Sequence, residues 1–337
     1  MALNLLHYRH RGEARWGVVR AGRIAPLAGR YSTTADLLAN NSIEALRLRA
    51  DACGETVAEA DVEWLSPITR NQQFVCQGAN YRRHMIESGM NPDEKTFNMI
   101  FTKAPSCIVA ADSPVVRPSH VRFLDYEIEL GLVLKRDIVA PVAVTEANLH
   151  EFVAGAVIVN DYSARDVQIP QMQFYKGKSY RTFGPVGPYL CLLDRDEIGA
   201  LGALELTLTV NGEVRQRDTT ANLVYGPAET LTELSGLQDL FAGDLLATGT
   251  PSGCALSVPS PVKMRIAGIL PEAAKWKMFI NVQAARTQYL KAGDVVEASI
   301  KSADGRIDLG VQRNRIEDAG RNRVVGVVEA FGAVATR

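Results

Sequence analysis

Three acidic side chains occupy alternate positions of one predicted strand, in the segment FLDYEIELGLVLKRD. Asp125, Glu127 and Glu129 should share one face of that strand, because successive strand residues point to opposite faces. The other face is apolar from Leu124 to Leu134, which predicts that it is buried in a core. Like charges about 7 Å apart repel by roughly 2 kcal/mol at a protein-like dielectric, and no basic residue separates them in the sequence. We therefore expect the strand to bind a cation.

An alternative is an edge strand whose acidic face is solvated. Such a face usually also carries lysine, threonine and serine, and this one carries none of them. The pattern therefore favours the cation site.

The size and charge of the chain narrow the classes of protein to which it can belong. Its 337 residues exceed one average domain, so we expect one large domain and a smaller one. The formal net charge of −1 argues against nucleic acid or an anionic membrane as an obligate partner. No apolar stretch is long enough to span a membrane, and the first residues lack the apolar core of a signal peptide. We therefore expect a cytoplasmic protein.

Cysteine usage agrees with a reducing compartment. The five cysteines are odd in number, scattered and never spaced as C-x-x-C, so we expect buried thiols and neither disulfides nor a zinc site.

The order of apolar runs and turn residues predicts an α+β fold that is mainly β. Residues 1–66 alternate strand-like and helix-like runs and should form a small N-terminal domain, with Pro67 as a hinge into the main domain at 67–337. From about residue 72, short apolar runs are separated by Gly, Pro and Asp, and LELTLTVNGEVRQ predicts a hairpin turning at Asn211-Gly212. Because no regular βαβ alternation appears, we expect a mixed, curled sheet system.

A third carboxylate for the cation site follows in VIVNDYSARDVQ, where Asp161 ends an apolar run. If the chain turns helical there, Asp161, Arg165 and Gln168 share one helix face. An aspartate that starts a helix and pairs with its own arginine is the alternative. Together with Glu127 and Glu129, Asp161 completes an all-oxygen site that suits Mg²⁺ or Mn²⁺ better than zinc. Three protein ligands leave positions for water and for a chelating enolate or 2-oxo acid.

A candidate general base lies in GANYRRHMIESG at residues 78–89. His84 and Glu87 are three residues apart on a short predicted helix, so the carboxylate can orient the imidazole to take a proton from water. The same spacing is also common on exposed helices, where it has no catalytic role. The glycines that flank the segment predict a short helix on a mobile lid.

Two lysines and a threonine are further candidates. Lys103 follows the apolar run MIFT, and Lys178 lies in YKGKSYRTFGPVGP. Either can hold a substrate carboxylate or a developing oxyanion, although such lysines are more often solvated surface residues. Thr250 lies in DLLATGTPSG, whose backbone N–H groups can bind a carboxylate or can simply form a tight turn.

These segments, taken in order, resemble the fumarylacetoacetate hydrolase (FAH) superfamily. The matching blocks cover most of residues 75–312 and are GANYRRHMIESG, FTKAPS, DYEIELGLVL, VNDYSARDVQ, GKSYRTFGPVGP, VNGEVRQ, AGDLLATGTPSG and LKAGDVVEASI. The resemblance implies a mixed β-sheet roll of the FAH type, a homodimer, a role in aromatic catabolism and Mg²⁺ or Mn²⁺ held by Glu127, Glu129 and Asp161. It implies that His84 and Glu87 activate water, that Lys178 is catalytic, and that a further set of residues contacts the substrate or the ion's ligands. That set comprises Tyr81, Lys103, Arg165, Gln168 and Thr250.

Two departures from the family pattern bear on the substrate. Arg181 follows GKSY where many relatives have Asp, and about thirty extra residues lie at about 255–287. This insertion either roofs the active site or extends a dimer interface, and the sequence does not decide between them.

The expected function is hydrolysis of a C–C bond in a 1,3-diketo acid of the acylpyruvate or fumarylpyruvate type. The same scaffold also suits isomerases, decarboxylases and hydratases of unsaturated 2-oxo dioic acids. A non-catalytic protein stabilised by a metal ion is the alternative from another class.

Overall fold

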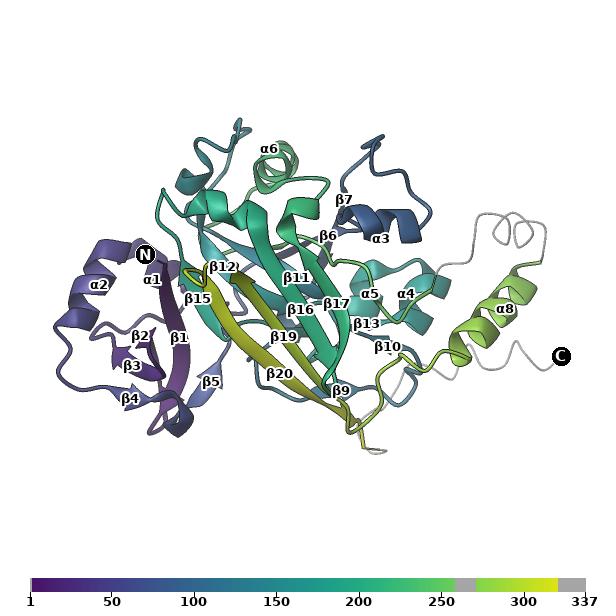
Figure 1. Cartoon of the computed structure of the whole chain (residues 1–337), viewed down its shortest axis with the longest axis horizontal. Helices are drawn as coiled ribbons and strands as arrows, with labels where there is room; N and C mark the ends of the chain where they lie inside the picture. Colours follow the sequence, from purple (N-terminus) through teal and green to yellow (C-terminus); the bar gives the residue numbers. More distant parts are fainter. Residues whose placement is uncertain (1, 258–270, 321–337) are drawn as a thin grey trace.

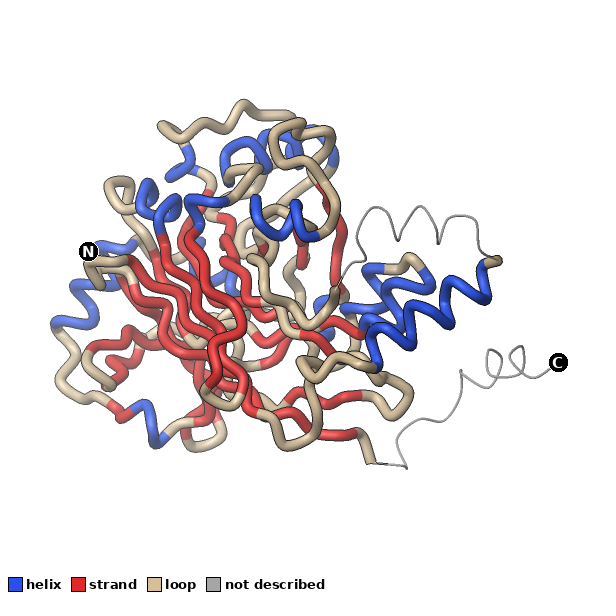
Figure 2. The backbone as a smooth tube through the Cα atoms, turned by 45° about the vertical axis from the view of Figure 1, so that its right-hand side comes forward, coloured by secondary structure: helices blue, strands red, loops and turns tan. Residues whose placement is uncertain are grey.

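The computed structural model describes residues 2–257 and 271–320, and these form two facing β-sheets with helices at the periphery (Figures 1 and 2). The strands are β1 (Leu3–His10), β2 (Glu13–Arg20), β3 (Arg23–Pro26), β4 (Val57–Ala58), β5 (Glu63–Leu65), β6 (Phe74–Gly78), β7 (Met99–Lys103), β8 (Ile108–Val109), β9 (Val115–Arg117), β10 (Leu124–Asp125), β11 (Ile128–Leu134), β12 (Val153–Asn160), β13 (Ser163–Ala164), β14 (Gly184–Pro185), β15 (Tyr189–Leu192), β16 (Leu204–Val210), β17 (Glu213–Thr219), β18 (Leu245–Ala247), β19 (Val295–Ser302) and β20 (Asp308–Asp318). The helices are α1 (Thr34–Ala39), α2 (Ile43–Asp51), α3 (Arg82–Glu87), α4 (Arg165–Gln171), α5 (Phe174–Lys178), α6 (Pro227–Leu237) and α8 (Glu272–Ala284).

The larger sheet has eleven strands, in the order β4-β3-β2-β1-β15-β12-β11-β18-β6-β7, with β5 beside β1. It is mixed, because β18 and β6 run parallel while β11, β12 and β15 pair antiparallel. Strands β11 and β12 lie in its middle and are buried along their whole length. Glu129 lies on β11, Glu127 directly precedes β11 and Asp161 directly follows β12, so these two strands place the predicted metal ligands in the interior.

The second sheet has five strands, in the order β17-β16-β19-β20-β9, and lies across the first (Figure 1). The inward side chains of β16 and β19 alternate with outward ones and pack on the apolar face of β11. Strands β16 and β17 form the predicted hairpin, and both turn residues, Asn211 and Gly212, have positive φ. The α+β, mainly β fold with mixed sheets is therefore confirmed.

The N-terminal segment is continuous with the larger sheet. β1 pairs antiparallel with β15 from the Leu3–Leu192 pair to the Leu6–Tyr189 pair. Apolar side chains of β1 and β2 share a core cluster with β6, β12 and β15. The segment before Pro67 thus extends the main sheet.

The predicted strand that contains the three acidic residues is broken in two. β10 pairs with β13 in a separate small sheet, β11 starts at Ile128 in the large sheet, and Tyr126 and Glu127 lie between them. The apolar face predicted from Leu124 to Leu134 is confirmed, since its members belong to one buried cluster. The prediction of one continuous strand is wrong. The chain changes its partner strand between Asp125 and Ile128, while the alternation of apolar and polar residues continues through that point.

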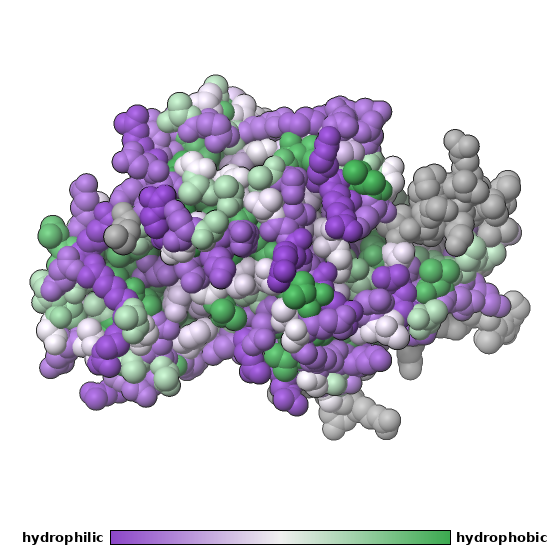
Figure 3. Space-filling view, in the orientation of Figure 1, coloured by the Kyte–Doolittle hydropathy of each residue, from purple (hydrophilic) through white to green (hydrophobic). Residues whose placement is uncertain are grey.

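None of the helices in the described residues is both long enough and apolar enough to cross a membrane. The face shown in Figure 3 is mostly hydrophilic, with small scattered groups of hydrophobic residues.

Candidate active site

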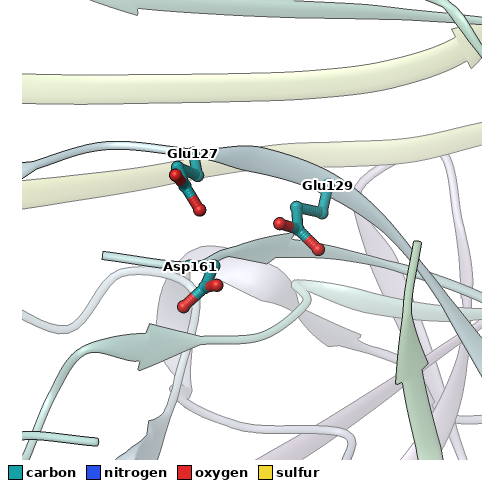
Figure 4. Close-up of side chains that lie close together, drawn as sticks. All are labelled: Glu127, Glu129 and Asp161. Atoms are coloured by element: carbon teal, nitrogen blue, oxygen red, sulfur yellow. The ribbon is translucent and has the colours of Figure 1, made fainter. Parts of the chain in front are cut away.

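Glu127, Glu129 and Asp161 come together in the interior, and their carboxylates point toward one another (Figure 4). All three residues are buried, and one oxygen from each lies within 4.8 Å of the others. They reach this position because β11 and β12 pair antiparallel with Ile128 opposite Asn160. The Asp161 N–H donates to the Glu127 carbonyl at 2.8 Å, which places both residues at the same end of the strand pair.

Basic residues from distant parts of the chain neutralise most of this charge. Arg165 donates to Asp125 through Nε at 2.8 Å and also bonds Glu127. Lys178 Nζ donates to Glu127 Oε2 at 2.5 Å and to Asp161 Oδ2 at 2.6 Å. No basic residue lies between the acidic residues of the predicted strand, yet the fold relieves their repulsion with side chains that are remote in sequence.

Compensation is uneven across the three carboxylates. Burial by itself would raise the pKa of Glu127, but Arg165 and Lys178 lower it to about 2. Burial, and then the charges of Asp161 and Glu127, raise the pKa of Glu129 well above its ordinary value. Within the described residues, the protein donor to Glu129 is the Gly249 N–H, at 3.0 Å.

The donor set fits a hard divalent cation. Three buried carboxylates converge, and the Glu129 charge has little compensation from the protein itself. Mg²⁺ and Mn²⁺ take all-oxygen sites of this kind, whereas zinc prefers His and Cys. The structure therefore supports a metal centre on Glu127, Glu129 and Asp161.

The triad opens into a cavity of about 650 Å³. Most of the predicted site residues line it, namely His84, Glu87, Glu127, Glu129, Arg165, Gln168, Lys178 and Thr250. The structure thus brings together residues from α3, β11, α4, α5 and the loop that follows β18.

His84 and Glu87 lie on α3, a single short helix as predicted. Burial lowers the pKa of His84, so its imidazole is neutral at pH 7 and can accept a proton. Glu87 is exposed and lies 3.6 Å from Arg83 in an ion pair. Within the described residues no hydrogen bond joins Glu87 to His84, so the two form no dyad in this conformation.

Two residues expected to contact substrate do not line the cavity. Lys103 Nζ donates to the Asp161 carboxylate and to the Phe183 carbonyl, so it holds a predicted metal ligand in place without lining the cavity. Tyr81 is fully buried, and its hydroxyl has no partner among the described residues.

Two other predicted residues line the cavity, and part of the hydrogen-bonding capacity of each side chain is already used within the protein. The Thr250 hydroxyl donates to the Ile128 carbonyl at 3.0 Å and accepts from Gln216 at 2.9 Å. Gln168 accepts from Arg165 Nη1 at 2.7 Å, and Arg165 in turn bonds Glu127, which ties α4 to the triad. α4 itself begins at Arg165, so Asp161 precedes the helix instead of sharing its face.

Asp125 has a different role from the two glutamates that follow it. Its carboxylate accepts from the backbone N–H groups of Ala255 at 2.7 Å and Leu256 at 3.0 Å, in addition to Arg165. The Leu290 N–H donates to the Leu124 carbonyl at 2.9 Å. Both ends of the insertion are therefore tied to the two residues of β10.

Sequence reasoning missed several cavity residues, most of them apolar. Phe101, Phe174, Met90 and Met99 lie at positions where an apolar residue is equally expected in a core. Arg286 was also missed, although a charged residue four positions before the start of the block LKAGD was a usable signal. Of the two roles left open for the insertion, the structure supports lining the site, through Leu256, Ser257 and Arg286.

Comparison with known proteins agrees with the geometry. Residues 73–317 match the family model described as fumarylacetoacetate (FAA) hydrolase C-terminal. The chain is 31% identical over 320 residues to 2,4-didehydro-3-deoxy-L-rhamnonate hydrolase of Sphingomonas sp. (strain SKA58), covering 94% of this chain and 96% of the relative. It is 34% identical over 208 residues to the oxaloacetate tautomerase YisK of Bacillus subtilis (strain 168), covering 61% and 67%.

A solved structure shows the same fold. The fumarylacetoacetate hydrolase from psychrophilic Exiguobacterium antarcticum superposes with a TM-score of 0.72 at 27% identity, covering 94% of this chain and all of that one. The relatives include a hydrolase and a tautomerase, so the family alone does not fix the reaction. The family model, the curated relatives and the solved structure agree, and this chain belongs to the fumarylacetoacetate hydrolase family.

Proposed function

We propose that the protein is a divalent-metal-dependent hydrolase that cleaves a C–C bond in a 1,3-diketo acid of the acylpyruvate or fumarylpyruvate type. One observation carries the proposal: two ligands of a buried carboxylate triad and a neutral histidine line the same cavity. A cation site next to a base is the pairing that hydrolytic attack on a chelated oxo acid requires.

The metal would be Mg²⁺ or Mn²⁺, held by Glu127, Glu129 and Asp161. When bound, it supplies Lewis-acid polarisation of a chelating 2-oxo acid and stabilises negative charge on the departing enolate. Lys178 and Arg165 keep the carboxylates close together against their mutual repulsion.

His84 would take the proton from the attacking water through its neutral imidazole. Glu87 would orient that imidazole after α3 moves, since in this conformation it pairs with Arg83. The Gln168 side-chain N–H₂ group has no partner among the described residues and is the donor we assign to the developing oxyanion. Lys178 also lines the cavity and adds positive charge there.

The test is a panel of acylpyruvates incubated with the purified protein and Mg²⁺ or Mn²⁺. We expect metal-dependent release of two carbon fragments, and a loss of roughly 10²- to 10⁴-fold in kcat for His84→Ala. His10→Ala, in the N-terminal segment away from the cavity, is the matched control. The proposal fails if no member of the panel is cleaved and His84→Ala behaves like the parent protein.

A second candidate is an isomerase or tautomerase of a 2-oxo dioic acid, with decarboxylation and hydration as related reactions. It is favoured by the separation of Glu87 from His84, because a single base can move a proton without activating water. The similarity to an oxaloacetate tautomerase points the same way. Product mass separates the two: one product of unchanged mass indicates isomerisation, and two fragments indicate hydrolysis.

We also propose that the protein works in the cytoplasm as a homodimer, in the catabolism of aromatic compounds. The homodimer and the catabolic role rest on the sequence resemblance, and the location rests on the five scattered cysteines, which suit a reducing compartment.

A further inference from the structure

Arg286 brings a positive charge into the catalytic cavity from the insertion at 255–287. The side chain is half-buried, and its Nε donates to the Ala255 carbonyl at 2.6 Å. Residues 2–257 and 271–320 provide neither an ion pair nor a hydrogen bond to its two terminal nitrogens. The guanidinium is thus fixed at Nε while its terminal donors remain available to a ligand.

The other two strong cations of the cavity are already committed. Arg165 uses Nε, Nη1 and Nη2 for Asp125, Gln168 and Glu127. Lys178 uses all three of its protons, because Ser163 Oγ accepts at 2.8 Å in addition to the two carboxylates. Within the described part of the cavity, Arg286 is therefore the strong cation whose charge no protein carboxylate balances.

Rigid anchoring makes this placement specific. The backbone at 255–256 is clamped by the buried Asp125, which also holds Arg165. The Ala255 carbonyl in turn holds Arg286. A short chain of hydrogen bonds therefore fixes Arg286 relative to Arg165, beside the metal triad.

The wall of the cavity suits an acyl chain. Its apolar members are Met90, Met99, Phe101, Ile169, Phe174 and Leu256. A volume of about 650 Å³ exceeds what a three-carbon oxo acid fills, so the cavity has room for an extended acyl group.

Arg286 also borders a second cavity, which is lined by other basic residues. A smaller cavity of about 300 Å³ is bordered by Arg286 together with Arg117, Arg122 and Lys291, and none of the described acidic residues lines it. Arg117 is paired with Asp318, but neither Arg122 nor Lys291 has a salt bridge within the described residues. This excess of positive charge favours an anionic group next to Arg286.

We propose that Arg286 is a specificity-determining residue that binds a carboxylate at the acyl end of the substrate. This inference rests on the proposed function, because it places the 2-oxo acid end at Glu127, Glu129 and Asp161. A guanidinium can bind the far carboxylate through two parallel N–H donors, and a neutral acyl group cannot use that charge.

The test uses a matched pair of unreactive probes of equal chain length, 2-oxoglutarate and 2-oxopentanoate. Their binding to the Mg²⁺-loaded protein is measured by calorimetry. We expect 2-oxoglutarate to bind at least about tenfold more tightly, and Arg286→Gln to weaken it by about tenfold to a hundredfold. The same variant should leave 2-oxopentanoate within about twofold, since that probe lacks the far carboxylate.

Two further variants separate recognition from folding. Arg286→Lys keeps the charge and loses the two-donor geometry, so it should retain part of the preference for 2-oxoglutarate. Arg195→Gln changes an exposed arginine that does not line the cavity, and it should alter neither affinity.

The inference is overturned if Arg286→Gln weakens both probes equally, or if it weakens neither. Because the measurement needs no turnover, it stays informative when the acylpyruvate panel gives no product. If the parent protein hydrolyses no acylpyruvate but still prefers 2-oxoglutarate in an Arg286-dependent way, the proposed hydrolase function is rejected and the role of Arg286 stands.

Discussion

Glu129 differs from its two partner carboxylates because the protein gives it one backbone donor and no salt bridge among the described residues. Its raised pKa means that the metal-free folded protein binds a proton there more readily than the unfolded chain does. Ionisation of Glu129 therefore destabilises the metal-free protein as the pH rises above about 4.5, and a bound cation removes that cost.

Glu129→Gln should abolish stabilisation by metal without unfolding the protein. The parent should gain about 2.7 kcal/mol when Mg²⁺ is present at 100 times its Kd. The variant should lose metal affinity by more than the roughly 10- to 100-fold that loss of an outer hydrogen-bond partner costs. Its metal-free melting temperature at pH 8 should equal or exceed that of the parent, because a neutral amide replaces a poorly compensated charge.

Calorimetric titration with Mn²⁺ and thermal melts with and without Mg²⁺ check both points. Glu205→Gln, on the exposed face of β16, is the control and should keep the metal response. A variant that still gains the full thermal shift would remove Glu129 from the metal site.

His84 sets the expected pH dependence of activity. Because burial lowers its pKa, the acid limb of kcat/KM should have its midpoint below 6.5, with a plateau at neutral pH. Stability should change in the same direction: the unfolded chain binds the proton more readily, so His84 lowers stability as the pH falls below 6.5. A pH–rate profile checks this, and the limb should vanish in the residual activity of His84→Gln. An acid limb at higher pH would contradict the assignment.

Sequence patterns identified the carboxylates and named Arg165 and Lys178 as candidates, but they did not show that these two cations balance Glu127. Alternation within one segment is a local signal, and it selected Glu127 and Glu129, which the structure places in one buried cluster with Asp161. The neutralising residues lie 38 positions away for Arg165 and 51 for Lys178. Which distant side chains meet them depends on how α4 and α5 fold back over the sheet, and periodicity carries no such information.

At the scale of elements, the turn after β18 positions the triad through its backbone. Gly249 has a φ of +89° and donates its N–H to Glu129. A Cβ at this position would lie 2.9 Å from the Asn80 Cβ. Asn80 cannot move aside easily, because its amide bonds the backbone of Tyr225 and Thr248.

Gly249→Ala should lower both stability and metal affinity. The positive φ alone costs roughly 1–2 kcal/mol, and the contact with Asn80 forces the N–H away from Glu129. Gly12→Ala is a matched control, because Gly12 has a φ of +84° with nothing within 4 Å of the added Cβ. Gly12→Ala should lose only the stability that the positive φ costs, and it should keep its Mn²⁺ affinity in calorimetry. Equal metal affinities in the two variants would count against this role of the turn.

Elements with strong local signals were predicted well, and those set by tertiary contacts were not. The β16–β17 hairpin was predicted from Asn211-Gly212. These two residue types adopt positive φ readily, so the turn depends little on tertiary contacts. The break between β10 and β11 was missed, because the alternation of apolar and polar residues continues through Tyr126 and Glu127. Only the pairing of Leu124 with Ala164, and of Ile128 with Asn160, reveals that the chain passes from one sheet to another.

At the scale of the whole molecule, the first 66 residues complete the larger sheet. The pairing of β1 with β15 covers an edge that would otherwise be exposed, and Leu3, Leu5 and Trp16 fill a shared core. An uncovered edge of this kind promotes aggregation.

A chain that begins at residue 67 should therefore aggregate, although it retains every proposed site residue. Size-exclusion chromatography with light scattering, beside the full-length protein, checks this. A monodisperse truncated protein that melts cooperatively and binds Mg²⁺ would show that the catalytic part is independent of the first 66 residues.

The attachment of both insertion ends to β10 has a consequence for how the protein can diversify. Leu256 and Leu290 are 34 positions apart in sequence, yet their N–H groups bond to adjacent residues, Asp125 and Leu124. Closing a loop costs only about 0.6 kcal/mol more for each doubling of its length. The residues between these two attachment points can thus be replaced during evolution without moving the carboxylate triad. Such a replacement would change the proposed preference for the acyl group and leave the proposed metal site as it is.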